Sequence, residues 1–205
     1  MWRALSGTIV SPLRTFAELE RDSHAARYGA LVLLGVSLVY TAILAIFISK
    51  GYPAAGRSIV GLPVERQYVA QIWYQAPLFF ASTALIAALL AVASRLASNS
   101  LAFGTAFGRL GLATAVPFAL STMLVESTVA ALMGFGVLRP LATLQWLQGP
   151  GAWFAALYQG IGLVWLVALV VVAVRTSGLR SWWVSAPVGL LLVVVYGLPI
   201  ALFIR

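Results

Sequence analysis

The sequence predicts an all-α membrane protein, a bundle of five transmembrane helices preceded by a short amphipathic interfacial helix. Two observations predict this fold. Of the 205 residues, 62% are hydrophobic and only 9% are charged, with a mean hydropathy of +1.00, whereas ordinary soluble domains are about 45–50% apolar. In addition, five long apolar runs recur along the chain, each close to the roughly 20 residues that an α-helix needs to cross a bilayer.

The composition also excludes several classes of function. The chain has no cysteine and one histidine, so disulfides, thiolate chemistry and Cys/His metal sites are ruled out. Five spans leave no room for a separate soluble domain, and zinc-helix, nucleophile-elbow and phosphate-loop motifs are missing, so we expect no enzymatic activity and no cofactor. The net charge of +8 indicates contact with the lipid bilayer and its anionic lipid headgroups rather than with nucleic acid.

The amino-terminal segment, residues 1–27, is expected to be cytoplasmic and retained, since it is too acidic for a signal peptide. Ser11 followed by Pro12 is typical of a helix start, because serine caps free amides and proline at the first helical position loses no hydrogen bond. Apolar residues then recur at helical spacing, at Leu13, Phe16 and Leu19. This pattern predicts an amphipathic helix in the headgroup plane. Its water-facing side would hold Arg14, Glu18 and Arg21.

The membrane domain is expected to occupy residues 28–205, with charged residues bounding its apolar runs. Its spans are predicted at about residues 28–49, 72–94, 110–133, 153–174 and 182–204. Among the prolines within these spans, only Pro117 is far enough from a helix end to kink its helix appreciably. A further short helix is predicted after Pro140, with an apolar face that would lie on the membrane. That face consists of Leu141, Leu144 and Leu147.

Cationic residues near the span ends predict the orientation. If the amino end is inside, the inner residues are Arg3, Arg14, Arg21, Arg27, Arg95, Arg109, Arg175 and Arg180. The outer residues are then Lys50, Arg57, Arg66, Arg139 and Arg205. The inner side has the larger number, so the amino terminus is predicted to be cytoplasmic. An odd number of spans places the carboxyl terminus outside.

Glu126 lies inside an apolar run, where a charged side chain costs at least a few kcal/mol. It is therefore expected to face the bundle interior or water, in the outer half of the membrane. Spans two and four begin on the side where span three ends, so their polar residues should gather around it. The expected cluster is Glu126, Thr122, Gln159, Gln75, Tyr158 and Lys50. Two interpretations remain open: a hydrogen-bonded glutamate that holds helices together, or a proton site, ion site or polar pocket that opens outward.

Three short segments resemble parts of a known family. They are Pro12 with Thr15, Phe16 and Leu19; residues 108–111 with Pro117; and residues 175–180. Together with the five spans, these segments resemble bacterial members of the Yip (Ypt-interacting protein) family, and the resemblance implies a five-span membrane architecture. Two features depart from the family pattern. Leu112 stands where an aromatic residue is common, and the Asp-Leu-Tyr-Gly-Pro stretch of the eukaryotic members is missing, so their GTPase partner is not carried over.

These observations lead to two functional hypotheses. The first is a non-enzymatic protein of the bacterial inner membrane that organises the membrane or acts as an adaptor, with a membrane-protein partner or a second copy of itself. The alternative is a small transporter, channel or lipid-moving protein that uses Glu126. The two hypotheses differ in the surroundings of that glutamate. A carboxyl group sealed among apolar side chains favours the adaptor, whereas one that lines a cavity reaching the surface favours the transporter.

Overall fold

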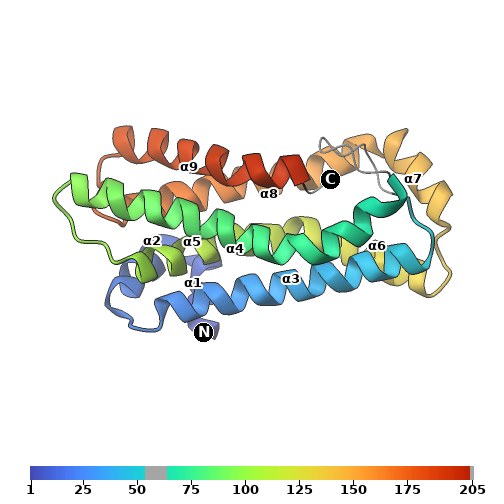
Figure 1. Cartoon of the computed structure of the whole chain (residues 1–205). Helices are drawn as coiled ribbons and strands as arrows, with labels where there is room; N and C mark the ends of the chain where they lie inside the picture. Colours follow the sequence, from blue (N-terminus) through green and yellow to red (C-terminus); the bar gives the residue numbers. More distant parts are fainter. Residues whose placement is uncertain (54–63, 204–205) are drawn as a thin grey trace.

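The computed structural model describes residues 1–53 and 64–203, and over these ranges it consists of helices and connections without a β-strand (Figure 1). The elements are α1 (Trp2–Val10), α2 (Pro12–Glu18), η1 (Leu19–Arg21), α3 (Ala25–Ser49), α4 (Val64–Leu96), α5 (Phe103–Phe118), η2 (Ala119–Met123), α6 (Leu124–Gly134), α7 (Pro140–Gln148), α8 (Ala152–Arg175) and α9 (Trp182–Phe203). The predicted outer cations Arg57 and Arg205, and the predicted span end at Ile204, lie outside the described residues.

Five helical segments in the described chain are long and apolar enough to cross a membrane. They are Ala25–Ser49, Arg66–Leu96, Phe103–Gly134, Ala152–Arg175 and Trp182–Phe203. The protein is therefore an all-α, multi-pass membrane protein, as the sequence predicts. The second and third segments begin earlier than the predicted starts at about residues 72 and 110, and three polar residues in these additional turns are buried in the bundle. These residues are Gln67, Gln71 and Arg109.

Glycines allow α3 and α5 to pack closely. Gly29 of α3 faces Gly108 and Gly111 of α5, and a Cβ added to Gly111 would lie 2.8 Å from the Gly29 Cα. A Cβ added to Gly108 would lie 2.3 Å from the carbonyl oxygen of Ala25. Small residues at such positions are typical of membrane helix pairs, since they let the two backbones approach. At Gly29, Gly108 and Gly111, the α3–α5 contact is therefore made by backbone atoms.

The third span changes its helical geometry directly after Pro117. Proline has no N–H to donate, so the regular hydrogen-bond ladder is interrupted there, and η2, a single π-helical turn, follows before α6 begins. The Ser121 hydroxyl in this turn donates to the Pro117 carbonyl at 2.6 Å. Gly162 of α8 lies against the same turn, where an added Cβ would be 2.2 Å from Ser121 Oγ. A π turn packed against α8 therefore follows Pro117, the residue at which the sequence predicts a kink.

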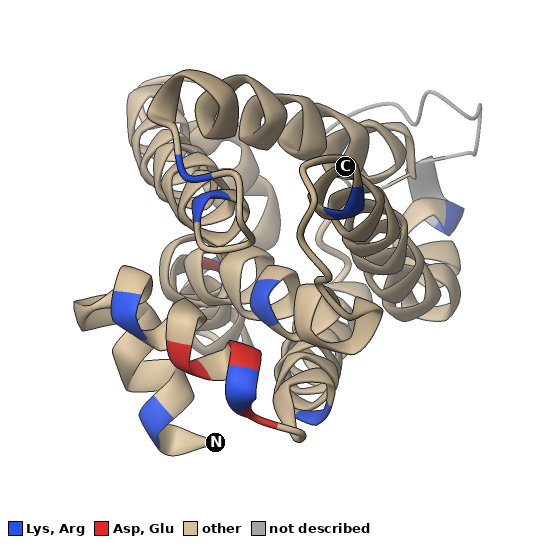
Figure 2. Ribbon diagram, turned by 90° about the vertical axis from the view of Figure 1, so that its left-hand side faces the viewer, with Lys and Arg blue, Asp and Glu red and all other residues tan. Residues whose placement is uncertain are grey.

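The amino-terminal helices lie at one end of the bundle, where cationic and acidic residues gather (Figure 2). Residues 12–21 are helical, as the sequence predicts. Phe16 and Leu19 are buried in the core, Leu13 is 47% exposed and is not covered by the bundle, and Pro12 occupies the first turn of α2. The helix α1 was not predicted, because its nine residues mix apolar and polar types without a clear start signal.

Candidate functional site

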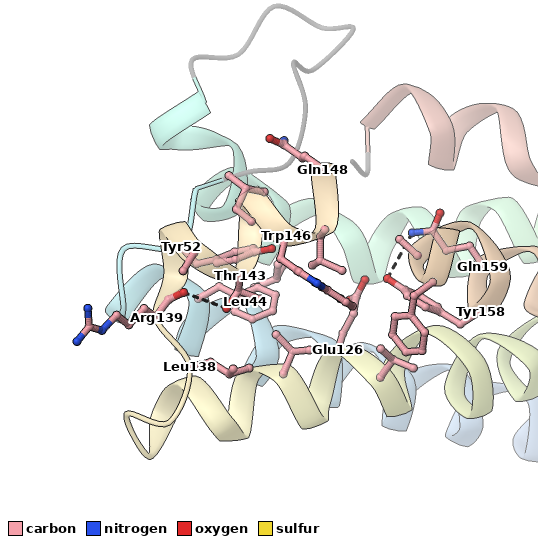
Figure 3. A pocket seen from close by; sticks show the side chains of 18 of the residues that line it. Leu44, Tyr52, Glu126, Leu138, Arg139, Thr143, Trp146, Gln148, Tyr158 and Gln159 are labelled. Atoms are coloured by element: carbon pink, nitrogen blue, oxygen red, sulfur yellow. Dashed lines mark hydrogen bonds between the residues drawn. The ribbon is translucent and has the colours of Figure 1, made fainter. Parts of the chain in front are cut away.

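A pocket of about 740 Å³ lies between α3, α6, α7 and α8 (Figure 3). It is at the end of the bundle opposite the amino-terminal helices (Figure 1). Glu126, in the first turn of α6, contributes to its wall. The volume falls within the range of about 300–1,000 Å³ that is usual for small-molecule sites.

Helical periodicity explains which residues line this pocket. Tyr40, Leu44 and Phe47 are spaced by four and three residues, so they share one face of α3 and line the pocket together. On α8, the spacing of Ala155 and Tyr158 has the same effect. The side chains that line the pocket therefore form one continuous stripe along α3 and another along α8.

The helix α7 covers one side of the pocket. Leu144 and Leu147 line it, while Leu141 is 65% exposed. The sequence predicted this helix correctly but expected all three leucines to lie on the membrane. Two of them line the pocket instead, because α7 packs against α8. The Trp146 ring extends the same wall and packs against Phe154 of α8, with ring centroids 6.4 Å apart.

The pocket opens at the molecular surface. Arg139, Trp146, Gln148 and Gln159 all line it and are all exposed. Figure 3 shows the Arg139 side chain directed away from the cavity and the indole nitrogen of Trp146 directed toward the Glu126 carboxyl group. Glu126 therefore lines a cavity that reaches the surface and is not sealed among apolar side chains.

Glu126 forms no ion pair and no hydrogen bond with the described part of the chain. The ion pairs among the described residues are Arg14–Glu18, His24–Asp22 and Arg109–Glu20, and all lie at the amino-terminal end. Among the described residues, the carboxyl group thus has no oppositely charged partner of the kind that normally accompanies an acid in a membrane interior.

The structure brings together part of the predicted polar cluster. Tyr158 and Gln159 line the pocket with Glu126, and the Gln159 amide donates to the Tyr158 hydroxyl at 3.5 Å. Gln75 is elsewhere: its amide donates to Thr41 Oγ1 at 2.6 Å. Lys50 ends α3 with an exposed side chain and is not among the lining residues.

Thr122 also does not line the pocket. It lies in the π turn, one turn before Glu126. Its hydroxyl oxygen would be 3.9 Å from a Cβ added to Gly162 of α8. The position of these side chains along their spans follows from the sequence, whereas the direction in which each side chain points from its helix depends on packing.

The role of Arg109 differs from the prediction that places it among the cationic residues of the cytoplasmic side. Arg109 is fully buried, and its guanidinium donates to the Thr176 carbonyl at 3.1 Å, to Ser177 Oγ at 3.0 Å and to Glu20 Oε2 at 3.3 Å. Ser94 Oγ also donates to the Ser177 carbonyl, at 2.8 Å. Arg109 therefore links the amino-terminal segment to the α8–α9 connection and is not available to lipid.

A local hydrogen bond stabilises the turn directly before α3. The Asp22 carboxylate accepts the backbone N–H of His24 at 2.8 Å, which lowers the pKa of the Asp22 carboxyl group because the bond favours the ionised form. This interaction fixes the turn that leads from η1 into the first span.

Comparison with protein-family models, with curated proteins and with solved structures finds no match to this chain.

Proposed function

We propose that this protein binds a small amphiphilic molecule in the Glu126 pocket, as a transporter, channel or lipid-moving protein of the membrane rather than as an enzyme. One observation carries the proposal: Glu126 lines a cavity of about 740 Å³ that reaches the surface. A purely structural glutamate would be expected to hydrogen-bond to neighbouring helices, and Glu126 has no such bond to the described residues. A pocket with apolar walls and few polar groups is typical of a ligand site.

The proposed setting is the inner membrane of a bacterium, with the amino terminus in the cytoplasm and the carboxyl terminus outside. The excess of cationic residues at the inner span ends supports this orientation. In that orientation the pocket lies in the outer half of the protein, since α6 and α7 follow the outward course of the third span. An amphiphile could then enter from the outer leaflet or from the outer surface.

Photolabelling tests the proposal. The full chain in neutral micelles is exposed to a long-chain alcohol that bears a diazirine, and the labelled peptides are mapped by mass spectrometry. Labelling within residues 138–159 should saturate and should be displaced by unlabelled alcohol, whereas labelling of lipid-facing surfaces should rise in proportion to the probe. Unsaturable labelling of this segment would contradict the proposal.

A pair of variants with the same added volume provides the control. Ala155→Phe places a ring in the pocket and should abolish the saturable labelling, because Ala155 lines the wall. Ala45→Phe places the same ring on the exposed face of α3 and should leave the labelling unchanged. Equal effects of the two substitutions would show that the label does not report on the pocket.

A second candidate function is membrane organisation or an adaptor role of Yip type, with another membrane protein or a second copy of this chain as partner. The observation that favours it is the helical segment 12–21, which carries part of the Yip resemblance and packs against the bundle through Phe16 and Leu19. Cross-linking and pull-down from native membranes would test it. Recovery of the chain without any cross-linked protein would argue against this candidate.

A further inference from the structure

We propose that the ligand of the Glu126 pocket is a lipophilic organic cation, an ammonium or phosphonium ion whose charge is surrounded by hydrocarbon groups. This inference rests on the proposed function, since it names the chemical class of the molecule bound there. Three features of the described residues support it: an acid without an ion-pair partner, the aromatic walls, and the lack of further acidic ligands for a metal ion.

The first feature is that Glu126 has no cationic partner among the described residues. Glu126 lines the cavity and pairs with no cation of the described chain. Arg139 is the basic residue among the lining residues, and its side chain is directed away from the cavity (Figure 3). A carboxylate in such a low-dielectric site attracts a positive charge more strongly than it would in water. A bound cation would therefore supply the missing partner.

The second feature is the aromatic character of the walls. The rings of Tyr40, Phe47, Tyr52, Trp146, Phe154 and Tyr158 line the pocket. Several contact one another, with ring centroids 4.7 Å apart for Phe47–Tyr52 and 5.5 Å apart for Phe154–Tyr158. Aromatic faces attract cations, and cages of such rings recognise quaternary ammonium groups. The rings would thus contact the charged centre and its hydrocarbon substituents together.

The third feature distinguishes an organic cation from a metal ion. Calcium requires about six to eight oxygen ligands, and magnesium keeps near-ideal octahedral geometry. No group of three or more His, Cys, Asp or Glu side chains that could hold a metal occurs among the described residues, and Glu126 is the acid that lines the pocket. A weakly hydrated organic cation does not need such a set of ligands, so it fits the site better.

Two probes of similar shape and opposite charge test this inference. Tetraphenylphosphonium and tetraphenylborate are each equilibrated by dialysis with the full chain in neutral micelles, and empty micelles correct for partitioning. The cation should bind saturably, and the anion should bind at least about tenfold more weakly, because it would face the Glu126 carboxylate. Equal binding of the two probes in the wild-type chain would overturn the proposal without any substitution.

Variants then assign the effect to specific residues. Glu126→Gln keeps the shape of the side chain and should weaken cation binding at least about tenfold, because it removes the charge. Trp146→Leu should weaken it about threefold to fivefold, because it removes one ring. The matched control, Glu18→Gln, neutralises an exposed carboxylate at the opposite end of the molecule and should change nothing. Unchanged cation binding in Glu126→Gln would also overturn the proposal.

The photolabelling experiment separates this inference from the proposed function. If the neutral alcohol labels the pocket saturably but the phosphonium ion shows no preference over the borate ion, the pocket binds amphiphiles and the cation inference is wrong. If neither probe binds saturably and the alcohol does not label the pocket, the proposed function fails as well.

Discussion

Replacing Gly108 with alanine should force α3 and α5 apart. The added Cβ would lie 2.3 Å from the carbonyl oxygen of Ala25 and 2.5 Å from its carbonyl carbon, whereas ordinary contact begins at 3.4 Å. The two backbones would have to separate by about 1 Å, the difference between the shortest and the ordinary distance. The obstructing atoms belong to the main chain of α3, so no change of side-chain rotamer can relieve the contact.

The expected magnitude follows from the cost of overpacking and the helix propensity of alanine. Overpacking typically costs about 1–3 kcal/mol, while alanine is favoured over glycine within a helix by up to about 1 kcal/mol. Gly35→Ala on α3 is the matched control, since nothing lies within 4 Å of a Cβ added there. Both variants gain the helix propensity of alanine, so this contribution largely cancels when their stabilities are compared. Gly108→Ala should therefore be less stable than Gly35→Ala by about 1–3 kcal/mol.

Reversible unfolding measures this difference. Both variants and the wild-type chain are titrated from neutral micelles into a denaturing detergent, and helix content is followed by circular dichroism. Gly35→Ala should unfold at the wild-type detergent fraction or above it, and Gly108→Ala at a lower fraction. Coincident unfolding curves for the two variants would refute the close α3–α5 contact.

Two further predictions concern the amino-terminal end and the orientation. Arg109→Gln removes a fully buried guanidinium with three hydrogen bonds, so it should lower the free energy of unfolding by about 1–3 kcal/mol and speed proteolysis of residues 1–24. The control, Arg14→Gln, changes an exposed residue and should cost less than about 1 kcal/mol. Equal protease sensitivity of the two variants would show that Arg109 does not hold the amino-terminal segment against the α8–α9 connection. Reporters fused to the two ends should appear on opposite sides of the membrane, the amino-terminal one in the cytoplasm, and finding both on one side would contradict the five-span topology.

The sequence was sufficient for the fold class because five long apolar runs have few alternatives to spanning helices. It was less informative where a polar residue is buried by its partners. Arg109 resembled a loop residue because a charge usually ends a span, yet Thr176, Ser177 and Glu20 accept its hydrogen bonds. These partners are distant in the sequence, and no local pattern identifies them.

In the candidate site, too, the sequence predicts only some of the side chains that lie together. Antiparallel geometry predicts Tyr158 and Gln159 beside Glu126, and both line the pocket with it, since the level of a side chain along the bundle depends only on its position along each span. Lys50 and Gln75 satisfy the same depth criterion but do not line the pocket. Which side chains meet depends on the rotation of each helix about its axis, and the hydropathy of a nearly uniform apolar span does not specify that rotation.

The π turn at Ala119–Met123 sets this rotation for Glu126. A π turn accommodates one extra residue, so the helix that follows is rotated by about 100° relative to an uninterrupted α-helix. Glu126 comes three residues after the turn, and in a regular helix its side chain would be directed away from its present position in the pocket wall. Pro117 interrupts the ladder, and Gly162 leaves room for Ser121 at the turn. The direction of the Glu126 side chain is therefore determined by the third span and its contact with α8.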